Sequence, residues 1–93
     1  MTIGLLQMEI MLPNSKSLKD KRSVIKHIFH RVRKKYNVAI SELEQNDSVG
    51  KALIGVTTLS NKADHCHQIL TQVEQFVSTE FGVVLVYRNM EML

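Results

Sequence analysis

The sequence is poor in the residues that lock a fold covalently or build a cofactor loop. It has one cysteine, one proline, four glycines and no tryptophan among 93 residues. A single cysteine excludes an internal disulfide framework and fits a reducing compartment. No apolar run approaches the roughly 20 residues of a membrane helix, and the first residues lack the basic region and cleavage site of a signal peptide. We therefore expect a cytoplasmic protein without membrane contact.

Signals for catalysis or for a metal site are also missing. The glycines form no glycine-rich loop, which excludes a nucleotide-binding P-loop, and no nucleophile elbow or zinc spacing is present. His65 and His67 flank Cys66, but on a helix they would project about 160° apart and could not close on one ion. His27 and His30 have no third ligand in register. The sequence therefore predicts no enzyme, no metal site and no cofactor.

Length and hydrophobic periodicity predict one α+β domain with one small core, over residues 1–93. Strands are predicted at 3–12, 37–44, 51–59 and 81–90. Helices are predicted at 18–36, with Ser15 or Ser17 as a cap, and from a cap at Ser60 or Asn61 to Thr79. This order of elements favours a ferredoxin-like βαββαβ sandwich, in which a four-stranded antiparallel sheet carries both helices on one face.

The strand predicted at 37–44 does not alternate cleanly. Val38 and Ile40 share one face, whereas strict alternation puts Leu43 on the other. Either a bulge near Ser41–Glu42 rotates the phase, or the strand has apolar residues on both faces. Residues 45–50, which follow it, have the composition of a turn.

Positive charge is concentrated in one segment. The formal net charge is only +3, but nine of the twelve Lys and Arg residues lie between Lys16 and Lys35, where Asp20 is the one opposing group. This segment therefore carries +8 and the rest of the chain −5. Such a segment is a candidate surface for an anionic partner, nucleic acid above all. The alternative is a solvated helix face whose lysines keep the protein soluble.

Helical spacing groups many of these cations on one side. Within an arc of about 120° the helix presents Lys19, Arg22, Lys26, Arg33 and Lys34, and His30 lies inside the same arc. At the helix start, hydroxyls and cations stand beside free backbone N–H groups, which attract phosphates; simple capping by Ser17 is the alternative there. The candidate phosphate-binding residues are Ser15, Lys16, Ser17, Lys19, Lys21, Arg22, Lys26, His30, Arg33 and Lys34.

The sequence lacks the features of two common modes of RNA binding. A ribonucleoprotein-type reader needs aromatic residues on its central strands, and residues 5–11 and 51–59 contain none. A KH module needs a GXXG loop, which is missing. RNA, free or in ribosomal particles, would therefore bind through its phosphates along the first helix. A second hypothesis is a structural or ligand-binding homodimer, because Ile3, Leu5 and Met11 make the outer sheet face half apolar.

Short motifs spread over the whole chain resemble the YlxP-like family of small bacterial proteins of unknown function. They are Gly4-Leu5-Leu6, Leu12-Pro13, Ser15-x-Ser17-Leu18-Lys19-x-Lys21-Arg22, Tyr36-Asn37-Val38, Glu42, Gly55-Val56 and Ser60-Asn61. The resemblance implies a ferredoxin-like fold. Family members are often encoded near transcription, translation-initiation and ribosome-maturation factors, which implies a role linked to RNA or the ribosome. The family motif residues are Ser15, Ser17, Lys19, Lys21, Arg22 and Asn37.

Overall fold

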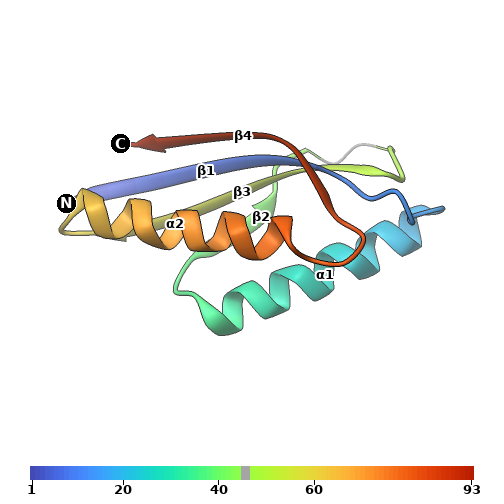
Figure 1. Ribbon diagram of the computed structural model, residues 1–93, viewed down its shortest axis with the longest axis horizontal. Helices are drawn as coiled ribbons and strands as arrows, with labels where there is room; N and C mark the ends of the chain where they lie inside the picture. Colours follow the sequence, from blue (N-terminus) through green and yellow to red (C-terminus); the bar gives the residue numbers. More distant parts are fainter. Residues whose placement is uncertain (45–46) are drawn as a thin grey trace.

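The protein contains four strands and two helices in the predicted order (Figure 1). A computed structural model describes residues 1–44 and 47–93; Gln45 and Asn46, in the predicted turn, lie outside the described residues. The elements are β1 (Thr2–Met11), α1 (Leu18–Lys35), β2 (Ala39–Glu42), β3 (Lys51–Ser60), α2 (Ala63–Ser78) and β4 (Val84–Met92).

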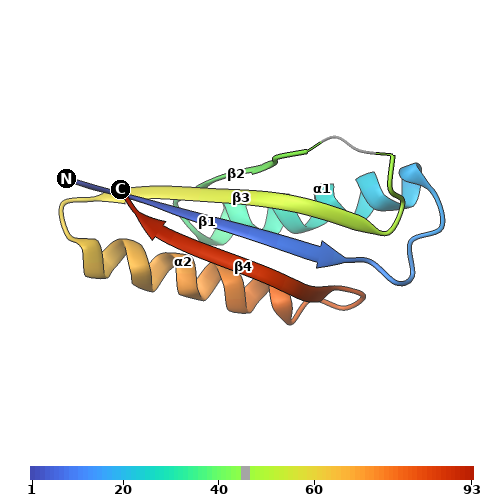
Figure 2. The same cartoon turned by 90° about the horizontal axis from the view of Figure 1, so that it is seen from above.

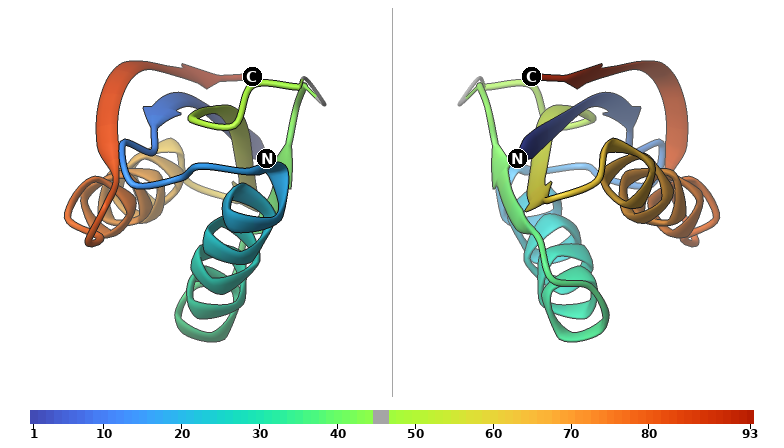
Figure 3. Two further views of the ribbon diagram at one scale, coloured as in Figure 1. Left: turned by 90° about the vertical axis from the view of Figure 1, so that its right-hand side faces the viewer. Right: turned by 90° about the vertical axis from the view of Figure 1, so that its left-hand side faces the viewer.

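The strands form one antiparallel sheet in the order β2-β3-β1-β4. In the register, Leu6 lies opposite Val56 of β3 and Met90 of β4. Both helices lie on the same side of the sheet, as the end-on views show (Figure 3). Seen from above, α1 lies behind β2 and β3, whereas α2 runs along the edge strand β4 (Figure 2). These features confirm the ferredoxin-like α+β fold.

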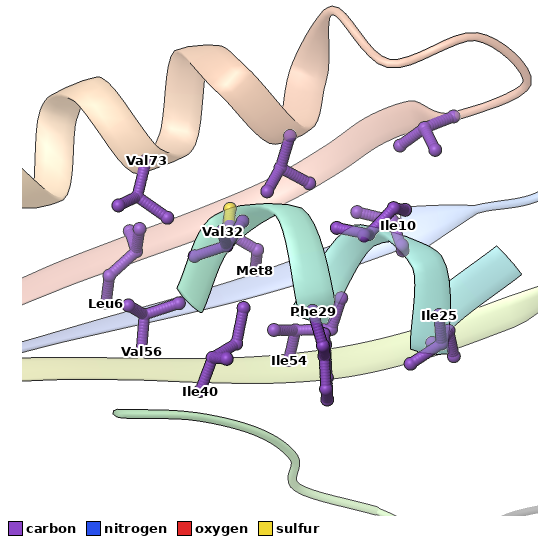
Figure 4. Close-up of a cluster of buried hydrophobic side chains, with 14 of the residues drawn as sticks. Leu6, Met8, Ile10, Ile25, Phe29, Val32, Ile40, Ile54, Val56 and Val73 are labelled. Carbon is purple, nitrogen blue, oxygen red and sulfur yellow. The ribbon is translucent and has the colours of Figure 1, made fainter. Parts of the chain in front are cut away.

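Alternation along β1 places the core. Leu6, Met8 and Ile10 are fully buried between the sheet and the helices, whereas the residues between them point to the other face. They meet Ile54 and Val56 of β3 and side chains of both helices (Figure 4). Burial of each large aliphatic side chain stabilises the fold by about 1.5–3 kcal/mol, so this continuous cluster holds the layers together.

The helix α1 begins and ends close to its predicted bounds. The Ser17 hydroxyl accepts a hydrogen bond from the Asp20 N–H at 3.0 Å and so caps the helix. The Asp20 carboxylate in turn accepts from the Lys16 N–H at 3.0 Å. At the other end Tyr36 is the C-cap, and its N–H donates to the Val32 carbonyl. Of the two predicted caps, Ser17 is therefore the one that caps this helix.

The start of α2 differs from the prediction. Lys62 occupies the N-cap position and makes no side-chain capping bond, so neither Ser60 nor Asn61 caps this helix. The Ser60 hydroxyl instead accepts from the Lys62 N–H at 3.2 Å, one step before the helix. Its position at the last residue of β3 leaves it too early to reach the first helical N–H groups.

The helix α2 lies close against β1 because residue 4 is glycine. A Cβ atom there would stand 2.8 Å from Leu70 Cδ1 and 3.3 Å from Cys66 Cβ. Cys66 is fully buried, and its thiol donates to the Thr2 carbonyl at 3.4 Å. The glycine therefore sets the distance between this helix and the sheet, and Cys66 belongs to the core.

Leu43 resolves the irregular pattern after β2. Its N–H donates to the Leu53 carbonyl at 2.8 Å, which continues the register of Glu42 opposite Ile54 without a bulge. Its side chain covers Gly55 on the outer face, where a Cβ would come 2.7 Å from Leu43 Cδ2. Of the two alternatives, the second is therefore correct: apolar residues lie on both faces.

Candidate functional site

The outward side of α1 carries a row of exposed basic side chains. We call it the basic face, defined as Lys19, Arg22, Lys26, His30, Arg33 and Lys34, all of which are exposed. Within residues 1–44 and 47–93, no carboxylate lies at ion-pair distance from any of these side chains. With a rise of about 1.5 Å per residue, the row extends over roughly 22 Å. Its charge is therefore available to a partner.

One member of the basic face is held by the fold. The Arg33 guanidinium donates from Nη2 to the Ile40 carbonyl oxygen at 3.0 Å, and it lies 5.4 Å from the centre of the Phe29 ring. These contacts restrain Arg33 beside β2 while leaving the residue exposed. Arg33 therefore presents a fixed positive charge at the rim of the row.

Lys21 lies apart from the predicted surface. It is only 3% exposed, and its ammonium group lies 3.3 Å from Glu42 Oε2 and donates to the Ser48 carbonyl at 3.0 Å. These contacts join α1 to the end of β2 and to the segment before β3. Because its charge is satisfied inside the protein, Lys21 belongs to the structural contacts of α1 and not to its exposed face.

Two further cations on α1 point toward α2. The Arg31 guanidinium lies 2.6 Å from Glu80 Oε1 and 5.0 Å from the centre of the Phe76 ring. The Lys35 ammonium lies 5.5 Å from the same ring and 5.6 Å from that of Tyr36. The two rings meet edge to face. These cations therefore tie the helices together.

The predicted phosphate site at the start of α1 is filled by the protein itself. The Ser15 hydroxyl donates to the Ser17 carbonyl, and the Ser17 hydroxyl accepts from Asp20. The exposed Asp20 carboxylate also places a negative charge beside the helix dipole, which phosphate would otherwise occupy. Of the two interpretations of this segment, capping is the one that the geometry favours, with Lys16 left exposed nearby.

An exposed aromatic residue lies near this helix start. Phe81 is 92% exposed in the turn before β4, and with Asn14, Ser15 and Ser23 it lines a hollow of about 340 Å³. The prediction placed Phe81 inside the last strand, but β4 begins only at Val84. The reason is Gly82, whose φ of +77° requires a turn at this position.

The sheet face opposite the helices has a different character. A close charge pair on this face joins Lys51 Nζ to Glu9 Oε1 at 2.5 Å. Hydrogen bonding to Glu9, together with the negative charge of Glu9, raises the pKa of Lys51 above its ordinary value. Positive charge on this face is thus already neutralised.

Side chains that could bind a metal ion do not cluster in the described ranges. No three His, Cys, Asp or Glu side chains gather there in a way that could hold a metal ion. No helix in the described part of the chain is long and apolar enough to cross a membrane.

Comparison with known proteins gives two findings. Residues 3–90 match the family model described as a protein of unknown function, DUF503. The chain is also 32% identical over 77 residues to the uncharacterized protein YlxP of Bacillus subtilis (strain 168). The aligned part covers 83% of this chain and 84% of that relative.

Proposed function

This chain belongs to the DUF503 family of proteins of unknown function, and for this member we propose a non-catalytic role in which the basic face of α1 binds RNA, free or in ribosomal particles. The observation that supports this proposal is the row of exposed side chains that form no ion pair in the described ranges. A cytoplasmic location agrees with the proposal, since RNA is plentiful there and the one cysteine is a buried free thiol.

The unpaired state of the row distinguishes it from a solubilising surface. Solubility is served equally well by mixed charges, and like charges three to four residues apart weaken an isolated helix. Outside the basic face, four cations pair with carboxylates, namely Lys21, Arg31, Lys51 and Arg88. Among the described residues no carboxylate pairs with a cation of the basic face, which is the arrangement that an anionic partner would complete.

Binding would proceed through phosphates. Five cations along roughly 22 Å of helix match the repeating charge of a nucleic-acid backbone, and their contact releases condensed counterions. Such contacts fix the position of the strand but carry no sequence information. We therefore expect affinity that depends strongly on salt and only weakly on RNA sequence.

A salt titration of binding to a single-stranded RNA tests this proposal. With five phosphate contacts, log K should fall with log salt at a slope of about −3.5, from roughly −0.7 per contact. Replacing Lys19, Lys26 and Lys34 together by Gln should make the slope shallower by about 2. Binding to ribosomal particles should be lost at high salt in the same way.

Single substitutions supply the matched control. Lys26→Gln should make the slope shallower by about 0.7, whereas Lys62→Gln, an exposed lysine at the start of α2, should leave it unchanged. The proposal would be wrong if RNA binding at low salt were insensitive to the triple change, or if the two single changes had equal effects. Either result would show that the basic face of α1 does not bind RNA.

A further inference from the structure

The outer face of the sheet, opposite the helices, is the largest feature that the proposed function does not use. The strand register arranges it in rows that cross the sheet. One end row contains Leu59, Ile3 and Leu93, and the other contains Lys51, Met11 and Val84. The next row from that second end contains Leu43, Leu53, Glu9 and Tyr87.

Large apolar side chains on this face are exposed to solvent. Leu59 is 67% exposed at one end, and Tyr87 and Val84 are 55% and 48% exposed at the other. Soluble monomers rarely expose contiguous apolar patches of more than a few hundred Å². Since the helices occupy the opposite side of the sheet (Figure 3), nothing within the described chain covers these residues.

The middle row of the face is polar and uncharged. It contains Ser41, Gly55, Gln7 and Asn89 from the four strands. An amide group is both donor and acceptor, so Gln7 can bond to an identical group of a second copy, while the Asn89 amide donates to Glu91 Oε1 at 3.2 Å. A charged side chain could not do so, because a like charge would repel it.

We propose that this face is a two-fold interface with a second copy of the same chain. In a two-fold interface each patch meets a patch of the same surface, so the surface must complement itself. A two-fold axis that lies in the interface, parallel to the sheet and perpendicular to the strands over Gln7, would place the end row with Leu59 on the end row with Lys51, Met11 and Val84. It would also place the uncharged middle row on itself.

Charge favours this occupant over the others. RNA would find only Lys51 on this face, and that ammonium group is already bound to Glu9. An anionic membrane surface would meet the same obstacle. A second copy brings apolar side chains and amides, which match what is exposed, and it keeps the two +8 segments apart on the outer sides of the pair.

The size of the face fits a weak dimer. Strands of up to 10 residues rising about 3.3 Å per residue and spaced about 4.8 Å give a face of roughly 500 Å². Two copies would then bury about 1,000 Å², the lower limit for a specific interface. We therefore expect a dissociation constant in the micromolar range, with the basic faces pointing in opposite directions.

Sedimentation velocity of the full chain over a series of concentrations, from a few micromolar to several hundred, tests the proposal. The wild type should shift toward a species of about 21 kDa, twice the 10.6 kDa chain. Leu59→Asp combined with Val84→Asp should remain monomeric. Phe81→Asp changes an exposed apolar residue outside the face and should dimerise as the wild type does.

A near-isosteric change probes the middle row. Gln7→Glu keeps the shape of the side chain but sets a carboxylate against its own copy, so the dissociation constant should rise at least tenfold. Circular dichroism should show unchanged folding, because Gln7 lies on the outer face. A wild type that stays monomeric at every concentration, or a dimer indifferent to both face variants, overturns the interface. Failure of RNA binding would leave these results untouched.

Discussion

The two helices occupy equivalent places on one side of the sheet but differ sharply in charge. Over its 18 residues α1 carries eight cations and one anion, whereas the 16 residues of α2 carry two anions and no cation. Both bury an apolar stripe in the same core. Packing on this sheet therefore does not require positive charge, and the cations of α1 need another explanation.

The helices also differ in how they meet the sheet. The backbone of α2 lies close to β1, β3 and β4, whereas that of α1 approaches only β2 and α2 within the described ranges. Lys21 and Arg31 pair with Glu42 and Glu80, and Lys35 lies against the Phe76 ring of α2. The cations that point outward have no such partner among the described residues. Some cations of α1 therefore make contacts within the protein, and the others remain exposed on its surface.

The largest loss of stability should come from removing a cation of α1 that pairs with a carboxylate of the protein itself. Lys21→Ala would leave Glu42 half-buried without its ammonium partner, and we expect a loss of about 2–4 kcal/mol in the free energy of unfolding. Lys26→Ala, on the basic face, should change it by no more than about 0.5 kcal/mol. Urea unfolding of both variants measures the difference. Equal losses in the free energy of unfolding would contradict the assignment of Lys21 to the structural contacts of α1 and of Lys26 to its exposed face.

A smaller loss of stability should result when the close approach of α2 to the sheet is disturbed. Gly4→Ala would place a Cβ 2.8 Å from Leu70 Cδ1 and 3.3 Å from Cys66 Cβ, and both of these residues are fully buried. We expect α2 to be pushed outward at a cost of about 1–3 kcal/mol.

Gly50→Ala is the matched control in thermal unfolding. A Cβ there would meet only the Leu12 carbonyl oxygen at 3.6 Å, an ordinary contact. Its stability should therefore be unchanged or slightly higher. If the Gly4 variant were equally stable, close approach of α2 would not be what residue 4 provides.

The smallest effect should come from the helix starts. Ser17→Ala removes the cap of α1 and should cost about 1 kcal/mol. In α2 the N-cap position lacks such a bond, so Lys62→Asp should add about 0.5–1 kcal/mol. Chemical denaturation of the two variants should therefore give shifts of opposite sign. A shift in the same direction would show that capping does not distinguish the helices.

The sequence predicts the fold because its strand and helix periods agree with the burial that is observed. Lys21 shows where such reasoning stops. It lies 4, 7 and 11 residues before Ile25, Ile28 and Val32, so helical spacing placed it on the buried stripe. Its residue type indicated a surface position instead, and its partner Glu42 is known only once β2 is placed beside α1. At α2 the predicted caps are wrong because β3 extends to Ser60 and the helix begins only at Ala63, which leaves Lys62 at the N-cap position.

The basic face itself was predictable, since exposed positions follow from helical spacing alone. What spacing could not reveal is which cations the fold uses. Arg31 bonds to Glu80, 49 residues further along the chain, and Arg33 bonds to the carbonyl of Ile40 in the next strand, β2.

Mapping of RNA contacts by amide chemical shifts tests the comparison of the two helices most directly. A short single-stranded RNA would be added to isotopically labelled protein at low salt. We expect shifts along residues 19–34 of α1 that disappear as salt is raised, with α2 and the outer sheet face unaffected. Shifts centred on α2 or on the sheet, or no shifts at any RNA concentration, would contradict the proposal that α1 carries its positive charge for RNA.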